Sequence, residues 1–137
     1  MILKSEAEGG IDISTDAEIL DLGCGTGIVG NLIKEKGYTN IFGLDASDNF
    51  IKMIHENKVY KGGEVLFLGQ GVDKFPEKFK NKYDLVTGTG VFLPKHCPAE
   101  TFDDAHAALK VGGHFIFTMR ANLWVDGEEH GYKDKIN

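Results

Sequence analysis

A glycine-rich segment that follows a short apolar run is the part of this sequence best suited to hold a ligand. It reads Asp21-Leu22-Gly23-Cys24-Gly25-Thr26-Gly27. Glycines at alternate positions let the main chain turn sharply and let a ligand lie against the backbone with no Cβ in the way. The helix expected next would point its N-terminal amides and positive dipole end at the same place. The segment predicts a ligand cradle; a tight turn without a ligand is the alternative.

Asp21 helps to decide which ligand the cradle takes. Residues 25–30 also satisfy the spacing G-x-G-x-x-G, which by itself would suggest a dinucleotide. A pyrophosphate is negatively charged, so an acid two residues before the loop disfavours it. S-adenosylmethionine (SAM) carries a sulfonium and an ammonium group, which the same acid can help to hold. The pattern therefore favours SAM over a nicotinamide dinucleotide.

Asp45 is a second carboxylate at the end of a predicted strand. A carboxylate there can accept hydrogen bonds from both hydroxyls of a ribose, which SAM and a nicotinamide dinucleotide share. Its alternative role is to cap the helix that follows. Ala46 comes next, and a small residue leaves room for an adenosine.

Alternating strand-type and helix-type segments must position these residues. Apolar runs predict five strands, over 18–22, 41–44, 65–68, 83–87 and 114–119, with glycine turns at 62–63 and 112–113. Helical spacing between them predicts three apolar faces. These faces are Val29, Leu32 and Ile33; then Phe50, Met53 and Ile54; then Phe102, Ala105, His106 and Leu109.

The helix ends also carry signals. Gly37 is expected to end the first helix, Ser47 or Asp48 to cap the second, and Pro98 to lie in the first turn of the third. Strands alternating with helices favour βαβ units. We expect an α/β fold, Rossmann-like and doubly wound, with a mostly parallel sheet of about five strands. It would form a single domain over 1–137, with its core at 17–120 and a loop or tail at 121–137.

Four segments together resemble class I SAM-dependent methyltransferases. Residues 19–27 are similar to the first signature of that superfamily and residues 43–47 to the second. Residues 83–86 resemble its fourth-strand signature, and residues 109–113 the turn into its fifth strand. The segments occur in the family's order and with its spacing. At a finer level, Leu68-Gly69-Gln70 and residues 118–122 resemble the methyltransferase-like family of the Williams–Beuren syndrome region.

The resemblance implies a role for each residue of a SAM site. The glycine loop would line the methionine end, Asp21 would face its amino group directly or through water, and Asp45 would hold the ribose. Gln70 stands where many relatives bond the adenine amino group, with an exposed turn residue as the alternative. The implied cofactor-binding set is Asp21, Gly23, Cys24, Gly25, Gly27, Asp45, Ala46, Gln70, Gly71, Val72, Thr87 and Gly88. Gly71 and Val72 would pack on the adenine, and Thr87 and Gly88 would lie near the sulfonium.

No general base stands out. Methyl transfer from SAM is an in-line displacement, so an enzyme mainly aligns the two reactants. His96 could act as a base, but a surface histidine is the commoner case, and His106 is expected to be packed in the core. Cys24 is expected to be a turn residue and not a nucleophile. Trp124 either borders an acceptor pocket or belongs to a tail.

Composition limits the other possibilities. With 15 basic and 21 acidic residues the formal charge is -6, and the lysines of residues 74–82 alternate with acids, so we expect a solvated loop and no nucleic-acid surface. No apolar run predicts a membrane span or a signal peptide, which favours the cytosol, with the nucleus as an alternative. The cysteines and histidines lack metal-ligand spacing, so no metal is expected.

The C-terminal part departs from the family pattern. Class I methyltransferases usually add an antiparallel hairpin beyond the fifth strand, and residues 121–137 show no strand pattern. We therefore expect a truncated chain whose fifth strand leaves an exposed edge, open to a partner or to self-association. Three functions follow: SAM-dependent methyl transfer to a small-molecule or otherwise undefined acceptor, SAM binding without transfer, and a nicotinamide-dependent oxidoreductase.

Overall fold

A five-stranded parallel sheet organises the computed structural model, which describes residues 13–92 and 100–119. The strands run in the order β3-β2-β1-β4-β5. Their bounds are β1 (Ile19–Leu22), β2 (Ile41–Asp45), β3 (Gly62–Val65), β4 (Tyr83–Phe92) and β5 (Leu109–Met119). Within these described residues, three α-helices and two short 3₁₀ helices join the strands: α1 (Ile28–Glu35), α2 (Asp48–Asn57), α3 (Thr101–Ala108), η2 (Val72–Lys74) and η3 (Glu77–Phe79).

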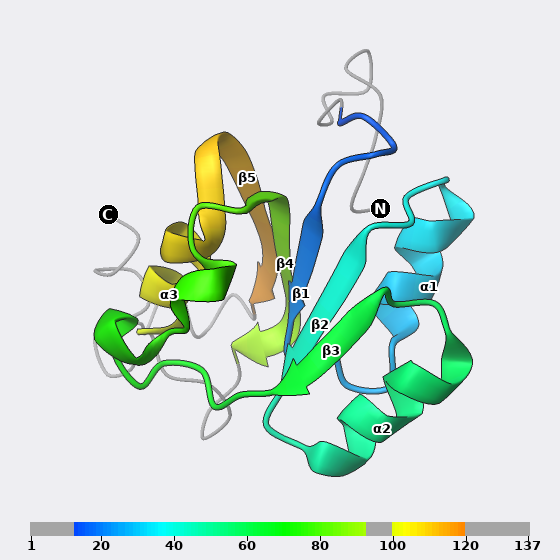
Figure 1. Cartoon of the computed structure of the whole chain (residues 1–137), viewed down its shortest axis with the longest axis horizontal. Coiled ribbons are helices and arrows are strands. Elements are labelled where there is room, and N and C mark those ends of the chain that lie inside the picture. The colour runs from blue at the N-terminus through cyan, green and yellow to red at the C-terminus, as the bar shows by residue number, and fades with distance from the viewer. Residues whose placement is uncertain (1–12, 93–99, 120–137) are drawn as a thin grey trace.

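Helices cover both faces of this sheet. Figure 1 shows α1 and α2 on one face and α3 with the 3₁₀ segments on the other. All four strand pairings are parallel, so the predicted doubly wound α/β fold is confirmed. Among the described helices, none has the length and apolar character needed to cross a membrane. The predicted tail at 121–137 lies outside the described residues.

The strand order reverses between β1 and β4. From β1 the chain moves outward to β2 and β3, then returns to place β4 on the other side of β1. In doubly wound sheets a ligand binds in the crevice at the carboxyl ends of the strands beside such a reversal. In Figure 1 these carboxyl ends lie at the lower edge of the sheet. The candidate ligand site therefore lies at the ends of β1 and β2, beside Thr87 of β4, which pairs with Asp21.

The core consists of two apolar layers, one on each face. All four residues of β1 are buried, as expected for a central parallel strand covered on both sides. One layer, on the α1 and α2 side, includes Ile19, Ile33 and Ile54. The other, on the α3 side, includes Leu20, Leu22 and Phe79. These layers hold the strand ends rigidly in register.

The third strand differs from the prediction. It covers Gly62–Val65, so residues 65–68 lie mostly beyond it, and the predicted glycine turn is part of the strand. The glycines are needed because neighbouring side chains lie over them. A Cβ on Gly63 would be 2.5 Å from Ile54 Cδ1, and one on Gly62 would be 2.8 Å from the Phe42 ring. The apolar run that follows contributes Leu68 to the core layer on the α3 side.

The helix ends agree with the prediction better than the helix faces do. Ser47 caps α2, since its Oγ accepts a hydrogen bond from the Phe50 N–H. Gly37 follows α1 with φ 97° and donates its N–H to the Lys34 carbonyl. Each predicted face agrees with the observed one only in part.

Two of the predicted helix faces need correction. In α2 the buried residues are Ile51 and Ile54, whereas Phe50 and Met53 are exposed. In α1, Gly30 and Ile33 are buried and Leu32 is exposed. Ile33 and Ile54 are buried as predicted and Val29 packs against the core, so the predictions for Leu32, Phe50 and Met53 are the ones that are wrong.

The third helix ends earlier than expected. It stops at Ala108, so Leu109 begins β5 and the predicted start of that strand at 114 is too late. The buried face of α3 consists of Thr101, Phe102, Asp104, Ala105 and Ala108. His106 is exposed, so the prediction of a core histidine is wrong. The expectation for Pro98 falls outside the described residues.

Candidate functional site

The glycine loop between β1 and α1 adopts a conformation that only glycine tolerates readily. Gly23, Gly25 and Gly27 have φ angles of 63°, 55° and 91°. Side chains rarely adopt this left-handed region. No atom lies within 4 Å of the place where a Cβ on Gly25 would stand. The loop therefore presents open main chain at the carboxyl edge of the sheet.

Asp45 braces that loop from the neighbouring strand. Its Oδ2 accepts a hydrogen bond of 2.9 Å from the Gly25 N–H, and its Oδ1 accepts one of 2.9 Å from the Ser47 N–H. The Cys24 N–H also donates to the Leu44 carbonyl at 3.0 Å. Asp45 is half-buried, and a carboxylate has lone pairs for further donors. Its orientation is fixed while part of its acceptor capacity remains open.

Asp21 occupies a very different environment one strand away. It is 1% exposed and accepts hydrogen bonds from the Tyr60 hydroxyl at 2.5 Å and from Thr87 Oγ1 at 2.8 Å. Burial raises the pKa of Asp21 to about 6, although both hydrogen bonds lower it, and the charge of Asp45 raises it further. Thr87 pairs with Asp21 across β1 and β4. Each oxygen of this carboxylate is thus engaged by a hydroxyl.

Tyr60 is a component of the site that the sequence reasoning missed. Its hydroxyl donates to Asp21 and accepts from the Gly30 N–H at 3.1 Å. A Cβ on Gly30 would stand 2.3 Å from the ring, so this glycine is required for the contact. Burial and the charge of Asp21 both raise the pKa of Tyr60, so the hydroxyl keeps its proton. Gly30, the last glycine of G-x-G-x-x-G, indicates that another group packs closely against the helix. The motif does not indicate that this group is Tyr60.

Cys24 is a buried residue of the loop. Burial raises the pKa of its thiol to about 12, and the charges of Asp21 and Asp45 act in the same direction. A thiolate is the reactive form of cysteine, so this side chain is unreactive at neutral pH. A Cβ on Gly43 would stand 2.9 Å from Cys24 Sγ, which shows how closely β2 approaches the loop.

A second glycine turn follows β3. Leu66 donates its N–H to the Asp45 carbonyl at 2.9 Å, so the segment begins beside Asp45. Gly69 and Gly71 have φ angles of 76° and 112°, and Gln70 between them is exposed. The Gly69 N–H donates to Asp104 Oδ2 at 2.7 Å. Val72 is 45% exposed.

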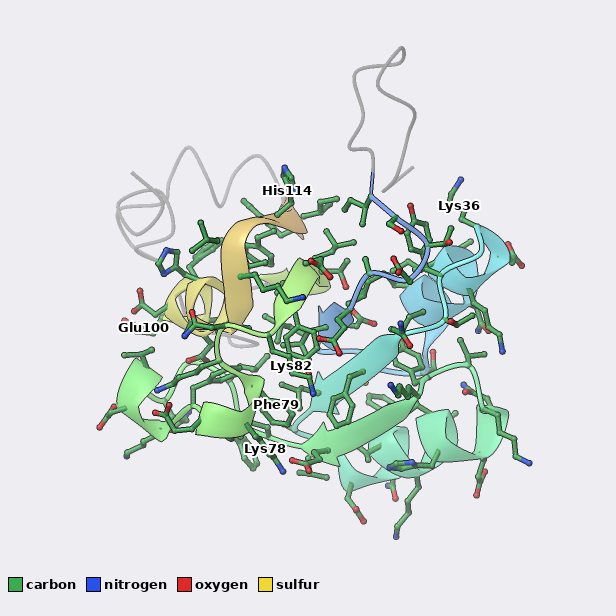
Figure 2. The ribbon with its side chains drawn as sticks, turned by 45° about the horizontal axis from the view of Figure 1, so that its top comes forward. Lys36, Lys78, Phe79, Lys82, Glu100 and His114 are labelled. Atoms are coloured by element: carbon green, nitrogen blue, oxygen red, sulfur yellow. The ribbon has the colours of Figure 1, made fainter. Side chains whose placement is uncertain are left out.

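The remaining candidates differ in how far they are exposed. Ala46 is exposed after β2, while Thr87 and Gly88 are buried in β4. The structure thus brings the glycine loop, Asp21, Asp45 and Thr87 to one edge. His96 and Trp124 lie outside the described residues. His114, labelled in Figure 2, is exposed.

Acidic and histidine side chains form no metal centre in the described part of the chain, where no group of three or more His, Cys, Asp or Glu could hold an ion. A hollow of about 480 Å³ lies at the opposite, amino-terminal edge of the sheet. Its lining includes residues that precede β1, together with Gly112, Gly113 and His114. It does not include the glycine loop.

Fold and site together define a doubly wound α/β protein with an open glycine loop at its topological reversal. The chain matches the methyltransferase domain family over residues 6–134. It belongs to this family, the class I SAM-dependent methyltransferases.

Individual relatives agree with this assignment. The tRNA U34 carboxymethyltransferase of Cellvibrio japonicus is 30% identical over 116 residues, which are 83% of this chain and 35% of that protein. Human methyltransferase-like protein 27 is 28% identical over 77% of this chain and 42% of its own length. The chain thus spans about a third to two fifths of these relatives.

A solved structure shows the same fold. It is a TehB-like SAM-dependent methyltransferase from Corynebacterium glutamicum, with a TM-score of 0.65 and 21% identity, covering 94% of this chain and 76% of that one.

Proposed function

We propose that the carboxyl edge of the sheet binds SAM and that the protein transfers its methyl group to a small-molecule acceptor. The observation that carries this proposal is the open main chain of Gly25 held by the Asp45 carboxylate at 2.9 Å. When bound, SAM would supply an activated methyl group on its sulfonium. The chain would supply the position of that group and a site shielded from water.

The glycine loop and Asp45 would hold two ends of the ligand. Gly23, Cys24, Gly25 and Gly27 would line the methionine part. Asp45 would accept bonds from the ribose hydroxyls, because its two backbone donors leave lone pairs unused. Ala46 would leave space beside the ribose.

The other predicted residues complete the proposed site. Gln70, Gly71 and Val72 would contact the adenine, and Thr87 and Gly88 would lie near the sulfonium. Asp21 already accepts two hydroxyl bonds and is almost fully buried. Of its two proposed routes to the ligand's ammonium, this environment favours the one through water.

Charge supports SAM over a nicotinamide dinucleotide. Asp21 and Asp45 lie close enough for the charge of Asp45 to raise the pKa of Asp21. A pyrophosphate between them would add further negative charge, whereas a cation would relieve the repulsion. Titration calorimetry with SAM and with NAD tests this: we expect heat of binding with SAM alone.

Surface charge favours a small acceptor over a nucleic acid. Figure 2 shows Lys78 and Lys82 on either side of Phe79. Lys78 pairs with Glu64 at 2.6 Å, and Lys80 pairs with Glu77 at 2.8 Å. Lysines that are already paired offer little to a phosphate backbone.

Within the family, we propose kinship with the methyltransferase-like group of the Williams–Beuren syndrome region, on the segments at 68–70 and 118–122.

A SAM-binding module without transfer is the second candidate, because the residues assigned above all belong to the cofactor side of the site. Release of S-adenosylhomocysteine from SAM in the presence of a metabolite pool separates the two. Product formation supports the transferase. Binding without product from any pool supports the module.

Replacement of Asp45 tests the proposed ribose contact. We expect Asp45→Ala to weaken SAM binding by about 1–3 kcal/mol, because hydrogen bonds to a charged group are lost. Calorimetry measures the change. Asp48→Ala is the matched control, since Asp48 is an exposed acid three residues later that pairs with Lys52. An affinity that Asp45→Ala leaves unchanged removes Asp45 from the site.

A further inference from the structure

A buried carboxylate outside the glycine loop holds the second glycine turn. Asp104 lies in the first half of α3, is 2% exposed, and accepts the Gly69 N–H with Oδ2 at 2.7 Å. The two residues are 35 positions apart. A hydrogen bond to a carboxylate is short and strong, so α3 is tied to this turn at one atom.

Burial of this carboxylate is costly, and the apolar packing of α3 does not require it. Asp104 Oδ1 has no hydrogen-bond partner in the described chain. Burial raises the pKa of Asp104, and the charge of Asp103 adds to this, whereas the Gly69 bond and the charge of Lys80 lower it. An apolar residue would suit the neighbouring Phe102 and Ala105 better. The carboxylate's one described partner is the turn.

The conformation of this turn depends on contacts from outside it. Gly69 and Gly71 both lie in the left-handed region, so local preferences do not select one conformation for it. Leu66 begins beside Asp45, and four residues span at most about 14 Å. A nucleoside whose ribose rests on Asp45 therefore has its base within reach of residues 69–71.

We propose that Asp104 is a positioning residue that sets the Gly69–Gly71 turn against the nucleoside base and so determines selectivity for adenine. This inference rests on the proposed SAM site. Asp104 acts through the Gly69 amide and need not touch the ligand. Loss of the hydrogen bond frees the turn, and the contacts to the base are lost while those of Asp45 to the ribose remain.

Variants at position 104 test the proposal by ligand selectivity. The probes are S-adenosylhomocysteine and its analogue with hypoxanthine in place of adenine, measured by calorimetry. We expect the unaltered protein to prefer adenine by roughly tenfold or more, the worth of one hydrogen bond to the base. Asp104→Leu should bring the two affinities within about threefold, and Asp104→Asn, which keeps an acceptor oxygen, should restore the preference.

Thr101→Val is the matched control. Thr101 is buried one turn earlier on the same face, and its Oγ1 has no hydrogen-bond partner in the described chain. This variant should keep the preference for adenine. A folded Asp104→Leu variant that still discriminates between the two bases overturns the proposal.

A measurement on the unaltered protein separates this inference from the SAM site. The Gly69 amide proton resonance should titrate with Asp104 above the ordinary carboxyl value of 3.8, because burial raises that pKa. Asp103 and Lys80 are the charged groups that act on Asp104. A resonance that does not move across the acid range overturns the positioning role, even if SAM binds. Absence of any binding, with the resonance titrating, contradicts the SAM site instead.

Discussion

Two carboxylates at one sheet edge are held in opposite ways. Asp45 is half-buried and accepts hydrogen bonds from two backbone amides, which fix its orientation. Asp21 is buried and bonded by two hydroxyls, and its pKa rises to about 6. Removing a carboxylate from water disfavours its charged form, and a nearby like charge adds to the effect. Burial of the Asp21 carboxylate therefore opposes folding when that group is charged.

Asp21→Asn should reveal that cost as a function of pH. The folded protein binds the Asp21 proton more tightly than the unfolded chain, so its stability falls as pH rises from 3.8 through about 6. Asn keeps the shape without the charge. The variant's free energy of unfolding, relative to the unaltered protein, should rise by about 2 kcal/mol between pH 4.5 and pH 7.5. Urea unfolding at both pH values measures it; a constant difference would contradict the buried charge.

Local pattern singled out some of the residues at the candidate site and not others. Asp21 and Asp45 lie at the ends of β1 and β2, and the glycine loop follows β1, so spacing alone could mark them as candidates. Tyr60 and Asp104 were missed because their partners lie 39 and 35 residues away, at Asp21 and Gly69. No short motif encodes a contact that depends on how two distant elements pack.

At the scale of elements, close approach explains where glycine is needed. The first helix packs so near Tyr60 that the Gly30 N–H reaches its hydroxyl at 3.1 Å. A side chain at position 30 would occupy the space of the ring. The contacts among α1, Tyr60 and Asp21 thus depend on one small residue, Gly30.

Gly30→Ala should destabilise the fold by about 1–3 kcal/mol, as overpacking of a buried site does. Helix propensity alone would give the opposite sign, a gain of about 0.5–1 kcal/mol. Urea unfolding distinguishes them. Asn31→Ala, at an exposed position of the same helix, is the control and should be neutral or stabilising. A Gly30→Ala variant as stable as the unaltered protein would show that Tyr60 moves aside without loss.

The order and type of the elements were predictable, but their faces and ends were less so. Alternation of apolar runs with helical spacing gave all five strands. The position of β3 was wrong because Gly62 and Gly63 were assigned to a turn, although Phe42 and Ile54 lie over them. The buried face of α2 was misplaced because large apolar residues such as Met53 were favoured over Ile51.

For the molecule as a whole, ligand binding should appear as thermal stabilisation. S-adenosylhomocysteine at 100 times its Kd should add about 2.7 kcal/mol to the folded state. For a chain of this size the Tm should rise by roughly 10 °C. Differential scanning fluorimetry measures the change, with NAD as the negative control. Equal shifts with both ligands would contradict the choice of SAM.

The central strands join parts of the chain that are far apart, and this has a consequence for folding. The bond between Thr87 and Asp21 closes a loop of 66 residues, as does that between Asp84 and the Glu18 amide. Contacts between distant segments form slowly, since the entropy of loop closure is lost before the contact is gained. We therefore expect a nascent chain that has not yet docked β4 to lack the cradle, so that the capacity to bind ligand arrives only with the last cooperative step of folding.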